Sequence, residues 1–244
     1  MIGAFRDDQS LRCQLEVVFI DDRGNIEEGR GSEVTREARS IFWREFFSSL
    51  AIGVAEKVPA IRHDFQRGEW QSVARILVAG FVQMRYFPVV LARAFVASCL
   101  FPEELFFTEW LLESFHLYIP RNESQSLKRG LSDQCEDPST DDEILDVLFT
   151  YGCYRRVQKA TLMKIVEELT HQKLIQKPRY VANAWQPTVH APKQHREFKD
   201  LPSLVELYTA KVPTPKKVCK LFEAQPVNDG ERECFDHLRD LSSH

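Results

Sequence analysis

Hydrophobic residues recur at helical spacing through the first half of the chain. Over residues 33–56 apolar side chains fall three or four positions apart with charged residues mostly between them, which predicts an amphipathic helix. Pro59 breaks this pattern. A second helix is expected over about residues 69–84 and a third over about 87–100. Pro102 suits the first turn of a fourth helix, which its missing N–H does not disturb.

These four helices are too apolar to lie on the surface, so we expect them to pack on one another. A short strand near residues 14–21 should pack against the first helix. Seven apolar side chains of this part should be largely buried. They are Phe42, Phe46, Ile76, Leu77, Val90, Phe95 and Leu111.

The pattern changes in the second half of the chain. Residues 121–143 are polar and nearly free of large apolar groups, which predicts a loop or a short, weakly ordered excursion. Thr140 and Glu143 have the spacing of a capping box, so a helix should begin there. Another helix is expected over residues 160–175. Residues 177–200 contain three prolines and are predicted to form an extended connector.

Two further helices are expected near the end of the sequence. Thr214 with Pro215 should open one, and Asn228 with Glu231 should cap the other. No internal repeat is present in the 244 residues. The sequence therefore predicts an α+β fold that is predominantly helical, with a little β-structure near its start.

Composition and charge narrow the class of protein. Hydrophobic residues make up 43% of the chain, which favours a globular fold, and the net charge of −4 gives no global electrostatic reason to bind nucleic acid. The most apolar region, residues 73–107, contains Arg75, Arg85 and Arg93, so no membrane span is expected. The start, MIGAFRDDQS, lacks the apolar stretch of a secretory signal. We expect a cytoplasmic or nuclear protein.

The six cysteines never form a C-x-x-C pair, which argues against a zinc ribbon or a disulfide framework. They are Cys13, Cys99, Cys135, Cys153, Cys219 and Cys234. Isolated cysteines fit a reducing compartment.

A glycine-containing turn ahead of the first helix raises the possibility of a phosphate-binding loop. Gly29 and Gly31 have no third glycine after them, and Glu27, Glu28 and Glu33 lie alongside. Carboxylates at a helix N-terminus would repel phosphate. We interpret this segment as a turn whose glycines only supply permissive backbone angles.

Several pairs of residues could carry chemistry, but each has a simpler interpretation. Cys234 and His237 lie three apart on one helix, yet two ligands do not hold zinc. His190 and His195 flank Pro192 with as little support for a metal. His63 and Asp64 are adjacent, and adjacent side chains rarely converge on one atom. The sequence nominates no catalytic, cofactor-binding or metal-binding residue and implies no cofactor.

The stretch over residues 173–199 is basic, and aromatic residues interleave with its charges, as on surfaces that bind single-stranded nucleic acid. The cations are Lys173, Lys177, Arg179, Lys193, Arg196 and Lys199, and the aromatics are Tyr180, Trp185 and Phe198. An acidic loop at residues 133–143 nearly balances this charge, so nucleic acid stays an alternative partner. Ser139 and Thr140 precede a run of acids and could be phosphorylated, although helix capping also explains them.

Residues 15–112 resemble the N-terminal lobe of HECT-type ubiquitin ligases. The resemblance rests on LEVVFIDDRGN, then EEGRG, then VTREARSIFWREFF, with Arg36 and Glu37 as the pair that opens the helix, and on EWQSVARILVAGFVQMRYFPVVLARAF. The later stretch ELYTAKVPTPKKVCKLFEAQPVNDGERECFDHLRDL is similar to the opening helices of the C-terminal lobe. The resemblance implies an N-lobe-like domain over residues 1–180, a connector over 181–200 and the start of a C-lobe over 201–244.

The resemblance also implies a role in ubiquitin transfer, with a ubiquitin-conjugating enzyme and ubiquitin as partners. The family's nucleophilic cysteine follows a threonine in a late C-lobe motif, and no Thr-Cys pair occurs here. We therefore expect an incomplete or inactive ligase domain that forms no ubiquitin thioester. Cys153, with Arg155 and Arg156 nearby, is the likeliest exception. A non-catalytic binding scaffold derived from a HECT ligase and a nucleic-acid-associated protein are the alternatives.

Overall fold

The computed structural model divides the chain into two compact units, Met1–Tyr208 and Thr209–His244. The residues that it describes are 1–13, 17–26, 31–101, 108–133, 135–190, 195–212, 214, 215 and 217. Nearly all of them belong to the first unit, which holds the hydrophobic core.

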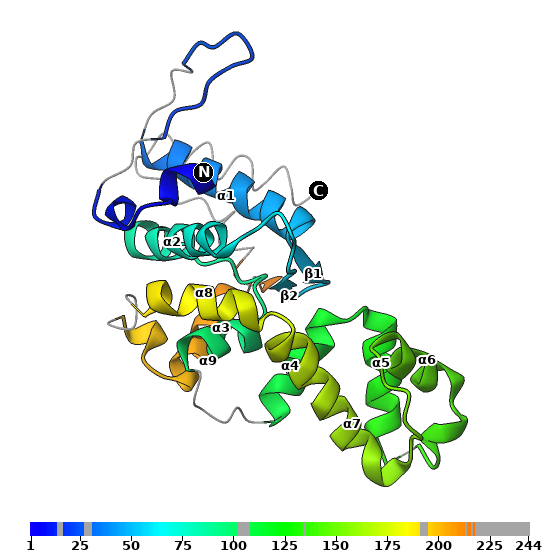
Figure 1. Cartoon of the computed structure of the whole chain (residues 1–244). Coiled ribbons are helices and arrows are strands. Elements are labelled where there is room, and N and C mark those ends of the chain that lie inside the picture. The colour runs from blue at the N-terminus through cyan, green and yellow to red at the C-terminus, as the bar shows by residue number, and fades with distance from the viewer. Residues whose placement is uncertain are drawn as a thin grey trace, which may run out of the picture. The chain divides into compact units, whose positions relative to one another are not determined.

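Helices make up most of the first unit (Figure 1). The helices and strands are α1 (Ser32–Ser49), β1 (Ala51–Gly53), β2 (Lys57–Pro59), α2 (Arg67–Met84), α3 (Arg93–Leu100), α4 (Thr108–Tyr118), α5 (Arg121–Leu131), α6 (Asp142–Thr150), α7 (Lys159–His171), α8 (Arg179–Val189) and α9 (Leu201–Lys211). Among the described residues the sheet has two antiparallel strands. The prediction of a mostly helical fold with a little β-structure is confirmed.

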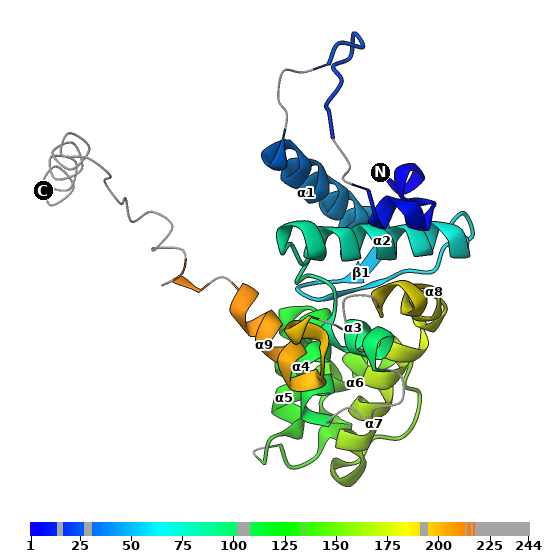
Figure 2. The ribbon, with the colours of Figure 1, turned by 90° about the vertical axis from the view of Figure 1, so that its left-hand side faces the viewer.

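Within the first unit, α1 and α2 lie at one end, and α4, α5, α6 and α7 gather at the other (Figures 1 and 2). Helices α3 and α8 lie between these groups, and α8 packs against both α2 and α3. In the second group α5 packs on α6, and α4 packs on α7.

The helix predicted over residues 33–56 is α1, but it ends at Ser49 and a β-hairpin follows. Gly53 in this hairpin has a φ of +124°, which right-handed helices exclude. A Cβ atom at this position would lie 2.2 Å from the carbonyl oxygen of Glu56, so only glycine fits. The helix has therefore ended, and the chain has turned into a hairpin, before Pro59 is reached.

The strand predicted over residues 14–21 is not present in the part of it that the structure describes. Residues 14–16 lie outside the described residues, and residues 17–19 have no regular structure. Ile20 forms a single antiparallel bridge with Ile26. Both isoleucines are more than half exposed, so this segment has no buried face that would fix it as a strand.

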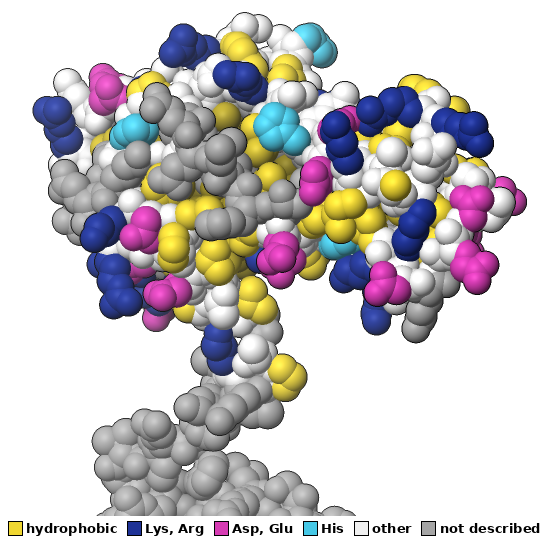
Figure 3. Space-filling model, turned by 90° about the horizontal axis from the view of Figure 1, so that it is seen from below, with side chains coloured by type: hydrophobic (Ala, Val, Ile, Leu, Met, Phe, Trp, Pro, Cys, Tyr) yellow, Lys and Arg dark blue, Asp and Glu magenta, His cyan; other side chains and the backbone are white. Residues whose placement is uncertain are grey.

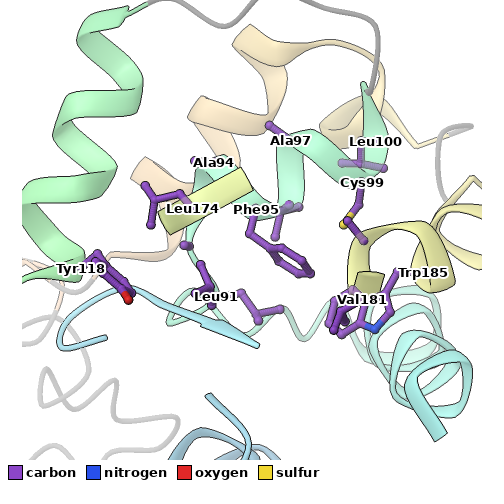
Figure 4. Close-up of a cluster of buried hydrophobic side chains, with 14 of the residues drawn as sticks. Leu91, Ala94, Phe95, Ala97, Cys99, Leu100, Tyr118, Leu174, Val181 and Trp185 are labelled. Atoms are coloured by element: carbon purple, nitrogen blue, oxygen red, sulfur yellow. The ribbon is translucent and has the colours of Figure 1, made fainter. Parts of the chain in front are cut away.

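A layer of large side chains joins α3 to α8 (Figure 4). Trp185 is 1% exposed, and its ring meets that of Phe95 edge-on with the centroids 5.2 Å apart. Cys99, Leu100 and Val181 lie in the same buried cluster. Edge-to-face aromatic contacts add stabilisation beyond the area that they bury.

The prediction of an extended connector over residues 177–200 is wrong, because this stretch contains α8. Pro178 precedes the first turn of α8, where a missing N–H costs nothing, and Pro187 lies close to the helix end. Val181 and Trp185, four positions apart, both face the core. Burial of this face outweighs the unfavourable prolines.

The prediction of a loop over residues 121–143 is also wrong, because the stretch contains α5. Its buried face is made of small residues around one large one: Ser124, Leu127 and Gly130 are all buried. A Cβ atom on Gly130 would lie 2.7 Å from Cδ1 of Ile144 in α6. This helix packs by close approach of its backbone, so it lacks the large apolar residues that signal a helix in a sequence.

The capping box predicted from Thr140 and Glu143 does not form. Asp141 is the N-cap of α6, and its Oδ1 accepts a hydrogen bond from the N–H of Ile144 at 3.2 Å. Thr140 donates its hydroxyl hydrogen to the carbonyl of Asp137 instead. The helix begins close to where it is predicted but with a different cap.

Four other predicted helices are present. The prediction over residues 69–84 matches α2, and the one over 160–175 matches α7 with a π-helical turn after it, Gln172–Gln176. The third, predicted over about 87–100, begins later, because α3 starts at Arg93. The fourth is seen from Thr108 onward as α4.

A buried carboxylate joins the hairpin to α3 and α4. The Glu56 side chain is 4% exposed and accepts hydrogen bonds from Arg93 Nε at 2.6 Å and from the Ser114 hydroxyl at 2.5 Å. The guanidinium of Arg93 also lies over the ring of Tyr208 in α9, 5.7 Å from its centroid. Burial raises the pKa of Glu56, and the charge of Arg93 with these hydrogen bonds opposes that shift.

The seven side chains that the sequence places in the core divide into two groups. Those that are buried are Phe46, Ile76, Leu77 and Phe95, and those that are half-buried are Phe42, Val90 and Leu111. Phe42 and Leu111 pack against the core from its margin.

The helices predicted near the end of the sequence lie almost wholly outside the described residues. At the predicted start of the first one, the backbone N–H of Lys217 donates to the Thr214 hydroxyl at 3.2 Å, as expected for an N-cap. The helix predicted from Asn228 and Glu231 lies outside the described part of the chain.

Replacement of Trp185 by alanine tests whether α8 is part of the core. We expect Trp185→Ala to lower the free energy of unfolding by about 3–5 kcal/mol, because it leaves a large cavity against Phe95. Tyr180→Ala, a change of an exposed aromatic on the same helix, should cost less than about 1 kcal/mol. Urea denaturation of both variants measures this difference. Equal losses would mean that α8 is not packed as described.

Candidate functional site

A groove of about 780 Å³ lies on the surface of the α4–α7 group, and we call it the α6–α7 groove. The segment that follows α6 forms one side, with Gly152, Cys153, Tyr154 and Arg155. The remaining lining residues come from α4, α7 and the π-helical turn: Leu111, Glu167, Glu168, Leu169, His171, Gln172 and Gln176.

Two exposed aromatic side chains mark the edge of this groove. Phe149 is 63% exposed and Tyr154 is 75% exposed. Their rings meet edge-on, with centroids 5.0 Å apart and an interplanar angle of 88°. We call Phe149 and Tyr154 the aromatic pair. Exposed large apolar side chains in contact with each other are typical of surfaces that bind partners.

The end of α6 explains why these rings meet. The N–H of Gly152 donates to the carbonyl of Phe149, and the N–H of Cys153 donates to the carbonyl of Leu148. This is the Schellman pattern of helix termination, with Gly152 at a φ of +91°. The reversal of the chain places Tyr154 back beside Phe149, so backbone hydrogen bonds hold the aromatic pair.

The arginine next to Cys153 in the α6–α7 groove is paired with a carboxylate, although a thiolate would need its positive charge for stabilisation. Arg155 donates to the carboxylate of Glu168 at 2.5 Å. Glu168 first, and then Cys153, raise the pKa of Arg155. Cys153 is half-buried and packs against the core. Of the two arginines predicted to favour a Cys153 thiolate, Arg155 therefore shares its charge with a carboxylate.

The other cysteines have no nucleophile-like surroundings in the described residues. Cys99 is 1% exposed, and burial raises the pKa of its thiol, as the apolar run around it predicts. Cys13 is exposed and Cys135 is half-buried. Cys219 and Cys234 lie outside the described residues, as does the Cys234–His237 pair.

The histidine pairs considered for chemistry do not assemble. Asp64 forms a two-pronged ion pair with Arg62, at 2.8 and 2.7 Å, and His63 is exposed beside it. His195 packs its ring against Phe81, whereas His190 ends α8. Among the described residues no group of three histidine, cysteine or acidic side chains is arranged to hold a metal ion.

The basic stretch over residues 173–199 does not present its aromatic side chains for stacking. Trp185 and Phe198 are buried, and Tyr180 is exposed. The described part of the face in Figure 3 carries a mixture of cationic, anionic and hydrophobic side chains. A platform for single-stranded nucleic acid needs exposed rings beside the cations, and two of the three rings are in the core.

The possible phosphorylation site lies in a short 3-10 helix, Pro138–Thr140. Asp137 caps this turn, since its carboxylate accepts from the backbone N–H of Ser139 at 2.9 Å. Ser139 is half-buried. Asp137, and not Ser139 or Thr140, therefore caps this turn. Phosphorylation of Ser139 or Thr140 stays a prediction.

A second groove, of about 550 Å³, lies between the hairpin, α4 and α5, and we call it the hairpin groove. His116 from α4 and Ser124 from α5 meet there, with Nδ1 and Oγ 3.0 Å apart. Burial, and then the charge of Lys128, lower the pKa of His116 to about 4. A neutral imidazole beside a buried hydroxyl resembles a base with its nucleophile, but no described carboxylate orients the ring.

The sequence does not single out the aromatic pair or the hairpin groove. Phe149 and Tyr154 are two of 23 phenylalanine and tyrosine residues, and only the helix cap brings them together. The glycine at 152 just after a helical pattern is the one signal of that cap. His116 and Ser124 lie on opposite sides of Pro120, which hides their proximity.

Comparisons with known proteins find no relatives: no family model, curated protein or solved structure matches the chain. In the part of the chain that the structure describes, no helix has the length and apolar character needed to cross a bilayer.

Acidification should destabilise the protein through His116. Its native pKa of about 4 lies below the ordinary value of 6.5, so the unfolded state binds more protons between these values. The free energy of unfolding should therefore fall as the pH drops from 7 to 4. Relative to His116→Asn, wild type should lose on the order of 2 kcal/mol, at about 1.4 kcal/mol per pKa unit with allowance for solvent screening.

Chemical denaturation at several pH values measures this loss. His63→Asn, which removes an exposed histidine, serves as the control and should follow the wild-type curve. A constant difference between wild type and His116→Asn across this pH range would contradict the expectation.

Proposed function

We propose that this chain is a HECT-like domain of the ubiquitin-transfer system that binds a ubiquitin-conjugating enzyme and forms no ubiquitin thioester itself. The observation that carries this proposal is the aromatic pair, with Phe149 63% exposed and Tyr154 75% exposed beside a groove. The resemblance of the chain to HECT ligases supplies the class of partner.

The position of the aromatic pair supports a docking role. The resemblance implies that the N-lobe binds the conjugating enzyme, and the aromatic pair falls within the N-lobe-like region, residues 1–180. Large aromatic side chains in the centre of an interface contribute most of its binding free energy. The edge-on contact also restrains the two rings before binding, which reduces the entropy lost in the complex.

The surroundings of the cysteines support binding rather than transfer. A thioester-forming thiol must be exposed and activated, and it must reach the donor thioester. Cys99 is buried. Cys153 is half-buried in the α6–α7 groove beside an Arg155 that pairs with Glu168. Neither cysteine combines exposure with an activating charge.

The nucleic-acid alternative has less support. It relies on aromatic side chains between the cations of residues 173–199, and Trp185 and Phe198 are buried there. Cations alone bind nucleic acid weakly and without stacking.

Binding of conjugating enzymes tests the docking role. A panel of uncharged conjugating enzymes is titrated against the purified chain by biolayer interferometry. Phe149→Ala and Tyr154→Ala should each weaken the complex about tenfold or more, because each removes a central aromatic contact. Met163→Ala serves as the matched control, since Met163 is an exposed apolar residue on neighbouring α7, 43% accessible. Failure of every enzyme to bind, or an equal loss in Met163→Ala, would refute the proposal.

A charged conjugating enzyme tests the absence of transfer. The chain is mixed with enzyme that carries a ubiquitin thioester, and a non-reducing gel is searched for a thiol-sensitive adduct. We expect none, because Cys99 is buried, Cys153 is half-buried and Arg155 beside it is paired with Glu168. An adduct that disappears in Cys153→Ala would show that the chain transfers ubiquitin, and it would leave the docking role intact.

A further inference from the structure

The hairpin groove contains positive charge that no carboxylate in the described chain neutralises. Arg121 and Lys128, from the two ends of α5, both line it, and neither forms an ion pair with a described acid. By contrast, Arg129 on the same helix pairs with Asp141 and Glu143, at 2.8 and 2.9 Å. The unpaired cations on α5 thus face the groove.

The remaining charged groups of the hairpin groove offset part of this positive charge, but they form a separate cluster around Arg93. Arg93 lines the groove too, but its guanidinium bonds Glu56 at 2.6 Å and lies 3.6 Å from the carboxylate of Glu113. Glu113 is therefore directed to Arg93. Two unpaired positive charges, from Arg121 and Lys128, are left for a ligand.

An apolar surface lies next to these cations. Val54 from the hairpin is 54% exposed and Leu117 from α4 is 38% exposed, and both line the groove. The hairpin fixes them side by side, since the N–H of Val54 donates to the carbonyl of Tyr118 at 3.0 Å. A ligand that fills the groove should combine an anionic group with an apolar group.

The pKa of His116 should respond to an anion bound in the hairpin groove, because this side chain lines the groove. It lies between the apolar surface and Ser124, and the charged groups that line the groove around it are Arg121 and Lys128 from α5, Glu113 from its own helix and Arg93 from α3. An anion held by the two unpaired cations would favour the imidazolium form. Binding of such a ligand should therefore raise the pKa of His116.

We propose that the hairpin groove binds a phosphorylated peptide, with Arg121 and Lys128 contacting the phosphate and Val54 and Leu117 contacting an apolar side chain of the peptide. A phosphate monoester carries between about −1.5 and −2 charges at neutral pH, so it can contact both of the cations that no described carboxylate pairs. A guanidinium and an ammonium are the groups that proteins use to bind phosphate. This inference does not rest on the proposed function, because the aromatic pair is not part of this groove.

Fluorescence anisotropy with defined peptide pools tests the proposal. The probe is a labelled pool of nine-residue peptides with central phosphoserine and degenerate flanks, compared with the same pool carrying serine or glutamate. The phosphoserine pool should bind about tenfold more tightly than either, as expected for charge-assisted hydrogen bonds. Arg121→Gln and Lys128→Gln should each remove several-fold of this preference, and the double variant should abolish it.

The controls separate the groove from general attraction between charges. Lys164→Gln removes an exposed lysine of α7 and should leave binding unchanged. In NMR titrations of wild type, the pKa of His116 should rise by about one unit or more with the phosphoserine pool, in line with one new charge–charge contact.

Three outcomes would overturn the inference. The first is equal binding of the phosphoserine, serine and glutamate pools, or no binding of any pool. The second is an affinity for inorganic phosphate equal to that for the phosphoserine pool, which would mean that the peptide adds nothing. The third is an equal loss of binding in Lys164→Gln and in the two α5 variants. Because Arg121 and Lys128 are exposed, their replacement should not disturb folding, which circular dichroism checks.

Discussion

The buried carboxylate of Glu56 is the interaction on which the arrangement of the first unit most depends. A carboxylate at 4% exposure is costly unless donors surround it. Its donors come from two different helices, Arg93 at the start of α3 and Ser114 in α4. The hairpin, α3 and α4 therefore reach low free energy only when they meet at this point. Loss of either donor would leave a buried charge without a partner, which is far worse than loss of a surface ion pair.

The same junction satisfies the end of α4. The last carbonyls of a helix have no partner within it, and here the hairpin supplies them: Ala55 and Glu56 donate their N–H groups to the carbonyl of Leu117 at 2.9 Å. Because the hairpin is bound to this helix end, Leu117 and His116 are held beside it. The hairpin groove is thus a consequence of how a helix terminates, as is the aromatic pair at the end of α6.

The long periodic helices could be predicted from sequence, whereas the elements that shape the surface could not. Helices α2 and α7 each carry a clear apolar stripe. Cys99 lies in an apolar run, which predicts that its side chain is buried. Helix α5 is missed by the hydrophobic pattern because its buried face contains Ser124 and Gly130, whose small size permits close approach of α6. Helix α8 is not predicted because prolines lie near both of its ends, and prolines in a sequence usually indicate a loop. Local propensity favours a loop in both cases, and tertiary packing decides otherwise.

The candidate sites are harder to predict than the fold because they depend on contacts between distant parts of the chain. The sequence places Arg155 near Cys153 but does not show that Glu168, 13 positions away, takes its charge. Likewise, nothing in the composition distinguishes Phe149 and Tyr154 from the many aromatics of the core. Phe149 lies on an exposed face of α6, and the reversal at Gly152 places the exposed ring of Tyr154 beside it.

The geometry of these surfaces suits the binding roles that we propose better than covalent chemistry by a thiol. Catalysis by a thiol needs an exposed nucleophile with an unshared positive charge or a base beside it. Cys153 has neither, since it is half-buried and its neighbour Arg155 is paired. Binding needs exposed groups whose positions are fixed in advance. The aromatic pair meets that requirement through the backbone hydrogen bonds of the α6 cap, and Val54 and Leu117 meet it through the hydrogen bonds that join the hairpin to α4.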